Sequence, residues 1–231
     1  MVTLTYLGHS CFTMDNGKRS IIIDPFLTGN PEAATQADKV KVDAVLASHG
    51  HDDHLGDAVA IAKRLKVPVI APYELACYCQ RQGAEAHPMH IGGAYQFPFG
   101  WVKLTQALHG SAVVRESIEY TGHPCGFIIQ MEGKHVYYAG DTGLFGDMAL
   151  LGKLHSLDVA LLPIGDNFTM GIADAVEATK MLNPAVVVPI HYGTFPVIKQ
   201  DPQVFAREVS AKTSARCVIL RPGEKLQVST G

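Results

Sequence analysis

The chain has 231 residues, of which 47% are hydrophobic and 18% charged, and its formal net charge at pH 7 is −3. This composition is typical of a globular protein with a sizeable apolar core and excludes a disordered chain. The slight negative charge gives no general attraction to nucleic acid or to an anionic membrane, so we expect neither as a partner. The length suits one domain, and we expect residues 1–231 to form it.

The start of the chain alternates polar and apolar residues over Met1–Leu7, which indicates a strand and not a secretory leader. No window reaches the length of apolar sequence that a transmembrane helix needs. The five cysteines include no Cys-x-x-Cys pair, which argues against a disulfide framework or a zinc ribbon. We therefore expect a cytoplasmic protein with reduced thiols.

The first half of the chain predicts strands that are followed by helices. Three short apolar runs, Thr3–Leu7, Cys11–Met14 and Ser20–Ile23, predict an antiparallel meander with a turn at Asp15–Gly17. The further elements predicted here are a strand at Ala44–Ala47, a helix at Asp57–Lys66, a strand at Val69–Ala71, a helix at Glu74–Gln82, and strands at Gln96–Phe99 and Val102–Gln106. The irregular segment Thr28–Lys41 is long for a compact domain, which favours a functional role.

The second half repeats this order. Its predicted elements are strands at Phe127–Met131 and Lys134–Tyr138, a helix near Phe145–Leu154, a strand at Val159–Leu162, a helix at Ile172–Leu182, a strand at Ala185–Pro189, a helix at Pro202–Thr213 and a strand at Arg216–Leu220. Two mixed sheets packed face to face, with helices outside, would satisfy this order in one α/β domain.

The most informative segment is His49-Gly50-His51-Asp52-Asp53-His54, which follows a predicted buried strand. Imidazole and carboxylate groups together suit borderline divalent metals such as zinc, manganese or iron. His49 and His51 lie two residues apart on an extended loop and can face one ion. Asp53 and His54 are then free to bind a second ion. The alternative is a solvated polar loop that binds no metal.

Three more metal-capable residues follow apolar runs, where side chains can converge on one edge of a sheet. They are His109, Asp141 and His191. Taken singly, each has a structural alternative, because a lone histidine after a strand is more often a satisfied structural residue and an aspartate in Gly-Asp-Thr-Gly is often a turn former. The motif at residues 49–54 needs further ligands, however, and these three positions offer them.

The order of these residues resembles the metallo-β-lactamase superfamily: the His-x-His-x-Asp-His loop, a later histidine, the Gly-Asp-Thr aspartate and a C-terminal histidine. Three further segments, Leu7–Cys11, Asp24–Leu27 and Pro163–Met170, resemble a small bacterial and archaeal branch of metal-dependent hydrolases that is similar to the ascorbate-6-phosphate lactonases. The resemblance spans nearly the whole chain. It implies a four-layer αβ/βα sandwich, with two mixed β-sheets flanked by helices and the metals at one sheet edge.

The resemblance also implies two divalent metal ions per chain, for which Zn2+ is the first choice and Mn2+ or Fe2+ are alternatives. The implied ligands are His49, His51 and His109 for the first ion, Asp53, His54 and His191 for the second, and Asp141 as the bridge between them. A hydroxide shared by the two ions would attack a small-molecule lactone, ester or phosphodiester, and Asp53 would orient it or accept its proton.

A few other polar residues are weaker candidates. His9 follows the first strand and could donate a proton to a leaving group, or it is a structural residue of a Gly-His-Ser turn. Asp24 could orient a ligand histidine from behind, as metal sites usually require, or simply form a turn. Asn167 and Thr169 could line the substrate mouth or cap their own loop.

Two other functions stay open. One is a nuclease like the tRNA-processing members of the superfamily, although the chain has neither their RNA-gripping insertion nor a basic segment interleaved with aromatic residues. The other is a metal-binding protein without turnover, although all seven ligand positions carry suitable residues. Related lactonases assemble, so a homo-oligomer is an alternative to a monomer.

Overall fold

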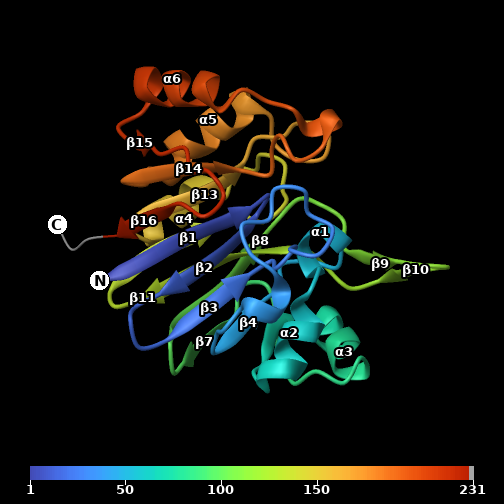
Figure 1. Ribbon diagram of the computed structural model, residues 1–231. Helices are drawn as coiled ribbons and strands as arrows, with labels where there is room; N and C mark the ends of the chain where they lie inside the picture. Colours follow the sequence, from blue (N-terminus) through green and yellow to red (C-terminus); the bar gives the residue numbers. More distant parts are fainter. Residues whose placement is uncertain (229–231) are drawn as a thin grey trace.

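Two seven-stranded mixed sheets form the centre of the computed structural model, which describes residues 1–228. Figure 1 shows helices on the outer faces of these sheets, with α5 (Ile172–Leu182) and α6 (Pro202–Lys212) on one side and α2 (Ala58–Leu65) and α3 (Tyr73–Arg81) on the other. This is the predicted αβ/βα sandwich.

The first sheet has the strand order β16-β1-β2-β3-β4-β5-β6. Its strands are β1 (Val2–Gly8), β2 (Cys11–Asp15), β3 (Ser20–Ile23), β4 (Ala44–Leu46), β5 (Val69–Pro72), β6 (Ala86–Met89) and β16 (Lys225–Val228). The predicted meander is confirmed, because β1, β2 and β3 pair antiparallel. From β3 to β6 the pairing is parallel, so these strands end at the same edge of the sheet.

The second sheet has the order β15-β14-β13-β12-β11-β8-β7. Its strands are β7 (Ala94–Phe97), β8 (Gly100–Gln106), β11 (Cys125–Met131), β12 (Lys134–Tyr138), β13 (Val159–Pro163), β14 (Val186–Ile190) and β15 (Arg216–Cys217). Strands β7, β8, β11 and β12 pair antiparallel, and β12 to β15 pair parallel. Each sheet thus combines an antiparallel half with a parallel half.

The apolar core lies in three layers, which explains why many strands are apolar on both faces. Ile21 and Ile23 of β3 belong to the cluster between the two sheets, and Ile22 belongs to the cluster under α2 and α3. In the second sheet, Tyr138 of β12 faces the other sheet while Tyr137 packs in the cluster under α5 and α6. Three apolar interfaces require four layers of secondary structure, which hold the strand ends rigidly.

Several elements differ from the sequence predictions. The strands β6, β9 (Ala112–Val114), β10 (Ile118–Tyr120) and β16 were not predicted. β16 and β6 are edge strands of the first sheet, and β9 and β10 form a separate hairpin, so pairing partners and not local pattern define them. The predicted strand Arg216–Leu220 ends already at Cys217, where its pairing with β14 stops.

The helices follow the predictions more closely. α5 has the predicted bounds, while α4 (Met148–Leu154) begins three residues later than expected. An unpredicted single turn of helix, α1 (Asp52–Leu55), lies inside the histidine motif. Short 3-10 turns occupy Ala37–Lys39 and Pro196–Ile198. None of the helices in residues 1–228 has the length and apolar character that crossing a lipid bilayer demands.

Candidate metal centre

The histidine motif follows β4 after Ala47 and Ser48, and it ends in α1. His51 has extended backbone and is the N-cap of α1, so Asp53 and His54 lie together in the single helical turn that follows. The β9–β10 hairpin, which projects from the body in Figure 1, is tied to this loop, since the Gly50 N–H donates to Ser111 Oγ over 3.1 Å. A Cβ at position 50 would collide with Thr121 Oγ1, which is why the motif has glycine between its histidines.

Other strand ends bring the remaining candidates to the same place. His109 follows β8, Asp141 follows β12 and His191 follows β14. Gly140 has a φ of +63°, and a Cβ there would lie 2.8 Å from the Cys125 carbonyl oxygen, so only glycine admits the turn before Asp141. The carboxyl ends of the two sheets thus supply all seven predicted ligands to one edge of the sandwich.

His9 and His191 both adopt left-handed backbone conformations, with φ of 58° and 53°. Such conformations are unfavourable for residues other than glycine and concentrate at functional sites. The His191 N–H donates to the His9 carbonyl oxygen over 2.9 Å, and this bond joins the ends of β14 and β1 across the two sheets. The hydrogen bond holds the two residues together despite the strain, and their imidazole rings lie side by side with centroids 4.2 Å apart.

One group of side chains at this edge consists of three histidines, His49, His51 and His109, whose ring nitrogens lie within 4.8 Å of one another. His49 Nε2 lies 3.0 Å from His51 Nδ1, and the His109 ring lies 5.1 Å from each of the other two rings. Burial lowers the pKa of all three histidines. They are therefore neutral at pH 7 and present free lone pairs, the state in which histidine binds a metal.

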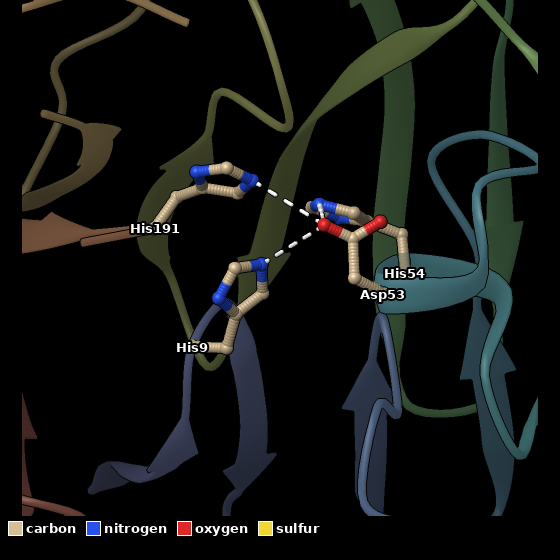
Figure 2. A group of neighbouring side chains, drawn as sticks. All are labelled: His9, Asp53, His54 and His191. Carbon is tan, nitrogen blue, oxygen red and sulfur yellow. Dashed lines mark hydrogen bonds and ion pairs between the residues drawn. The ribbon is translucent and has the colours of Figure 1, made fainter. Parts of the chain in front are cut away.

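The second group combines His9, Asp53, His54 and His191. Figure 2 shows the three imidazoles around the Asp53 carboxylate. Asp53 Oδ2 lies 3.2 Å from Nε2 of His9, 3.6 Å from that of His191 and 3.9 Å from that of His54. The predicted second ligand set is thus assembled, and His9 joins it as a fourth side chain.

Asp141 lies between the two groups. Its Oδ1 is 3.1 Å from His54 Nε2, and its Oδ2 is 3.0 Å from His191 Nε2. The same Oδ2 lies 3.5 Å from His109 Nε2, which belongs to the first group. One carboxylate therefore reaches histidines of both groups, as a bridging ligand must.

The charges around the second group are finely balanced. Burial lowers the pKa of His54, but three surrounding carboxylates outweigh it and hold the pKa well above the ordinary value. Burial likewise lowers the pKa of His191, and the negative charge of Asp141 reverses this and raises it to about 9. His9 differs, because burial dominates its environment and lowers its pKa to about 4.

The donor set fits a divalent metal. His54 Nε2, His191 Nε2 and Asp141 Oδ1 are buried, and none of them forms a hydrogen bond within residues 1–228 although they lie 3.0–3.1 Å from an oppositely charged neighbour. Buried polar atoms without hydrogen bonds are unfavourable, and a cation between them would satisfy them. Imidazole nitrogens and carboxylate oxygens are the ligands that zinc, manganese and iron accept.

Residues behind the ligands complete the site. Asp24 Oδ2 lies 2.7 Å from His54 Nδ1, the orienting contact proposed for it from sequence. Three other residues of the site were not predicted: Ser48 and Tyr138, which donate hydrogen bonds to Asp24, and Thr194, whose Oγ1 lies 2.9 Å from His9 Nδ1. Hydroxyl groups on and after apolar strands are common, so local pattern could not mark them.

Asn167 and Thr169 lie in the loop after β13. The Asn167 backbone N–H donates to Asp166 Oδ1, and the Thr169 hydroxyl donates to the Met170 carbonyl. Within residues 1–228, the hydrogen bonds of these two residues stay inside their own loop, as the loop-capping alternative expects. Their role in substrate binding remains a prediction.

Comparison with known proteins identifies the class. The sequence model of a family described as "Beta-lactamase superfamily domain" matches residues 3–191. The chain therefore belongs to the metallo-β-lactamase superfamily. More particularly, it is 56% identical to a UPF0173 metal-dependent hydrolase of Pelotomaculum thermopropionicum, with 97% of this chain and 99% of the relative covered. A relative of the same name from Desulforamulus reducens is 55% identical over the same shares.

Solved structures support the same assignment. The metallo hydrolase Igni18 from the archaeon Ignicoccus hospitalis is 39% identical and has a TM-score of 0.89, with 97% of both chains covered. The metallo-β-lactamase fold protein YhfI of Bacillus subtilis is 15% identical, has a TM-score of 0.72, and is matched over 97% of this chain and 98% of its own. The latter likeness concerns the fold alone.

Proposed function

We propose that this metal-dependent hydrolase of the metallo-β-lactamase superfamily works with two divalent metal ions and cleaves a small-molecule ester or lactone. The position of Asp141 is the observation that carries the proposal. Its carboxylate lies within 3.5 Å of histidines from both groups, at His109 on one side and at His54 and His191 on the other. A site for one ion would not need a carboxylate shared in this way.

The ligands of the first ion would be His49, His51 and His109, those of the second Asp53, His54 and His191, with Asp141 common to both. Zn2+ is the ion that we propose, with Mn2+ or Fe2+ as alternatives, because all three accept nitrogen and carboxylate donors. When bound, the ions would lower the pKa of water toward about 7 and polarise the carbonyl group of the substrate.

Asp53 and His9 would handle protons. Asp53 is 30% exposed at its side chain, the most accessible of the carboxylates here, so it can orient the attacking water and accept its proton. His9 shares Asp53 Oδ2 through its Nε2, over 3.2 Å. It is therefore placed to receive that proton and pass it to the leaving group.

The surroundings of the centre favour a neutral acyl group over a phosphodiester. In the described part of the chain, the ion pairs of Asp24, Asp53 and Asp141 are all with histidines, and Arg115, which contacts the histidine motif, is paired with Asp52, so no lysine or arginine is bound to these three carboxylates where it could clamp a phosphoryl group. Leu108, next to His109, is 49% exposed and Phe168 is 56% exposed. The Leu108 N–H donates to Thr142 Oγ1, and the N–H of Met170, two residues after Phe168, donates to the Thr142 carbonyl, so both apolar side chains belong to loops that are bonded to the residue after Asp141.

The net charge of −3 and the lack of a basic segment support a small-molecule substrate and neither nucleic acid nor membrane as a partner. All five cysteines are free thiols, as expected in the cytoplasm. A homo-oligomer is compatible with this function.

The test combines metal analysis with a substrate panel. Protein stripped with a chelator and reloaded with Zn2+, Mn2+ or Fe2+ should take up two ions per chain. The reloaded protein should hydrolyse chromogenic esters or lactones with a higher kcat/KM than chromogenic phosphodiesters. Uptake of less than one ion per chain would contradict the metal site, and a preference for phosphodiesters would contradict the acyl substrate.

A further inference from the structure

Asp24 is a completely buried carboxylate with an unusually full set of hydrogen bonds. It follows β3 with a left-handed φ of 44°, and its side chain has no solvent exposure. Oδ1 accepts from the Ser48 backbone N–H over 2.7 Å. Oδ2 accepts from the Ser48 hydroxyl over 2.5 Å, from the Tyr138 hydroxyl over 2.7 Å and from His54 Nδ1 over 2.7 Å. Four donors stabilise the carboxylate as an anion in an apolar interior.

The directions of these bonds follow from the chemistry of the groups. A carboxylate only accepts, so both the Ser48 hydroxyl and His54 Nδ1 must donate to Asp24. Having donated its single proton, the Ser48 oxygen can only accept from its other neighbour, His49 Nδ1, at 2.9 Å. His49 therefore has its proton on Nδ1 and its lone pair on Nε2, and His54 keeps its proton on Nδ1, so only the proton on its Nε2 can give way to a metal ion.

The two histidines belong to different groups of the centre. His49 Nε2 faces His51, in the group of three histidines, and His54 Nε2 faces the Asp141 carboxylate. Asp24 itself lies within 4.8 Å of ring nitrogens of both, yet its oxygens are already taken by the four donors. It acts as a hydrogen-bond hub and not as a ligand.

We propose that Asp24 is a positioning residue for both halves of the centre: it fixes the tautomer of His54 directly and that of His49 through the Ser48 hydroxyl, so one buried carboxylate couples the affinities for two ions. Tyr138 holds the carboxylate in place from the opposite sheet. The inference depends on the proposed two-metal function. It predicts that changes at Ser48 affect one ion, whereas changes at Asp24 affect both.

Competition titrations with a chromophoric chelator test this, with wild-type protein first and then its variants. In Ser48→Ala, one ion should be bound about 10–100-fold more weakly, the size expected for loss of an outer-shell partner, and the other with unchanged affinity. Ser48→Thr keeps the hydroxyl and should restore wild-type binding. Asp24→Asn should weaken both ions, and Tyr138→Phe should weaken both by a smaller factor.

Tyr137→Phe is the matched control, because it removes the same hydroxyl from the neighbouring residue on the other face of β12. It should leave both affinities unchanged. A second readout is the 15N spectrum of histidine-labelled, zinc-loaded protein, in which His49 and His54 should each have a slowly exchanging proton on Nδ1. Ser48→Ala should lose the slow exchange of His49 alone.

The outcomes separate the two proposals. A wild-type protein that binds a single ion contradicts the two-metal function. A wild-type protein with two ions, of which neither is weakened in Ser48→Ala, contradicts the role of Asp24 while the function stands. Should Asp24→Asn fail to fold, Tyr138→Phe decides instead, and an effect on one ion only, or none, overturns the coupling.

Discussion

The two halves of the metal centre differ in what surrounds their histidines. The rings of His49, His51 and His109 lie close together, and burial keeps them neutral. His54 and His191 lie among carboxylates, which raise their pKa values against the effect of burial. The histidines of the first half can thus bind a metal ion at pH 7 as they are, whereas His54 and His191 must first release a proton. Histidines of the two halves therefore differ in protonation state, and so in whether a metal ion must displace a proton, because the charges around them differ.

The largest effect is expected where the halves meet. Asp141→Asn keeps the shape of the side chain but removes the charge that both halves share, so we expect lower metal content and a loss of hydrolysis of at least about 10³-fold. Elemental analysis and kcat/KM measure the two losses. His90→Ala, at an exposed histidine outside the three metal-capable groups, is the control. An asparagine variant with two ions and full activity would show that the halves do not depend on Asp141.

Substitution of a ligand in one half should have a smaller effect, confined to the affinity for the ion of that half. His51→Ala should weaken the first ion, and His191→Ala the second, each by at least about 100-fold, since a direct ligand matters more than an outer-shell partner. Metal titration of each variant should retain one tight site. If either variant lost both ions equally, the division into two halves would be wrong.

The charge difference itself predicts a pH dependence in metal-free protein. The folded-state pKa of His191, about 9, exceeds the ordinary 6.5, so its stabilising effect is complete below about pH 6.5 and is lost as the pH rises through 9. His54 is shifted in the same direction. We expect chelator-treated protein to lose stability between these pH values, by about 3 kcal/mol from His191 alone.

Chemical unfolding at pH 6.5 and pH 9 measures this loss. Metal-loaded protein is the comparison, because metal replaces the protons and its stability should change much less over that interval. A metal-free protein that gained stability toward pH 9 would mean that the carboxylates do not control these histidines.

The smallest effect is expected at Thr194, which contacts His9 of the second half. Thr194→Val removes the hydroxyl at His9 Nδ1 with little change of shape, and a neutral hydrogen bond contributes about 1 kcal/mol, so kcat should fall by less than about tenfold with the metal content unchanged. Steady-state kinetics on the preferred ester or lactone measure this change in kcat. A loss of metal would place Thr194 among the groups that hold the ions.

Much of the fold followed from the sequence because the pattern of apolar residues is strong. The meander at Cys11–Met14 and Ser20–Ile23 and the helix Ile172–Leu182 lie where alternation and helical spacing predict them. β6 and β16 escaped prediction because an edge strand is defined by the neighbour it pairs with, and such neighbours are remote in sequence.

The sequence by itself determined which residue types stand after the strands: the histidine motif at His49–His54, with His109, Asp141 and His191 later in the chain. Their chemistry points to a metal whatever the path of the chain, because imidazole and carboxylate groups at strand ends have few other uses together. The family resemblance implied that Asp141 is the bridge, but only the tertiary structure placed its two oxygens beside histidines of both halves and placed Asp24 and Ser48 behind both His54 and His49. The contacts of Asp141 with His54 and of Asp24 with Tyr138 join the two sheets, and no local pattern encodes a distance between residues that are 87 or 114 positions apart.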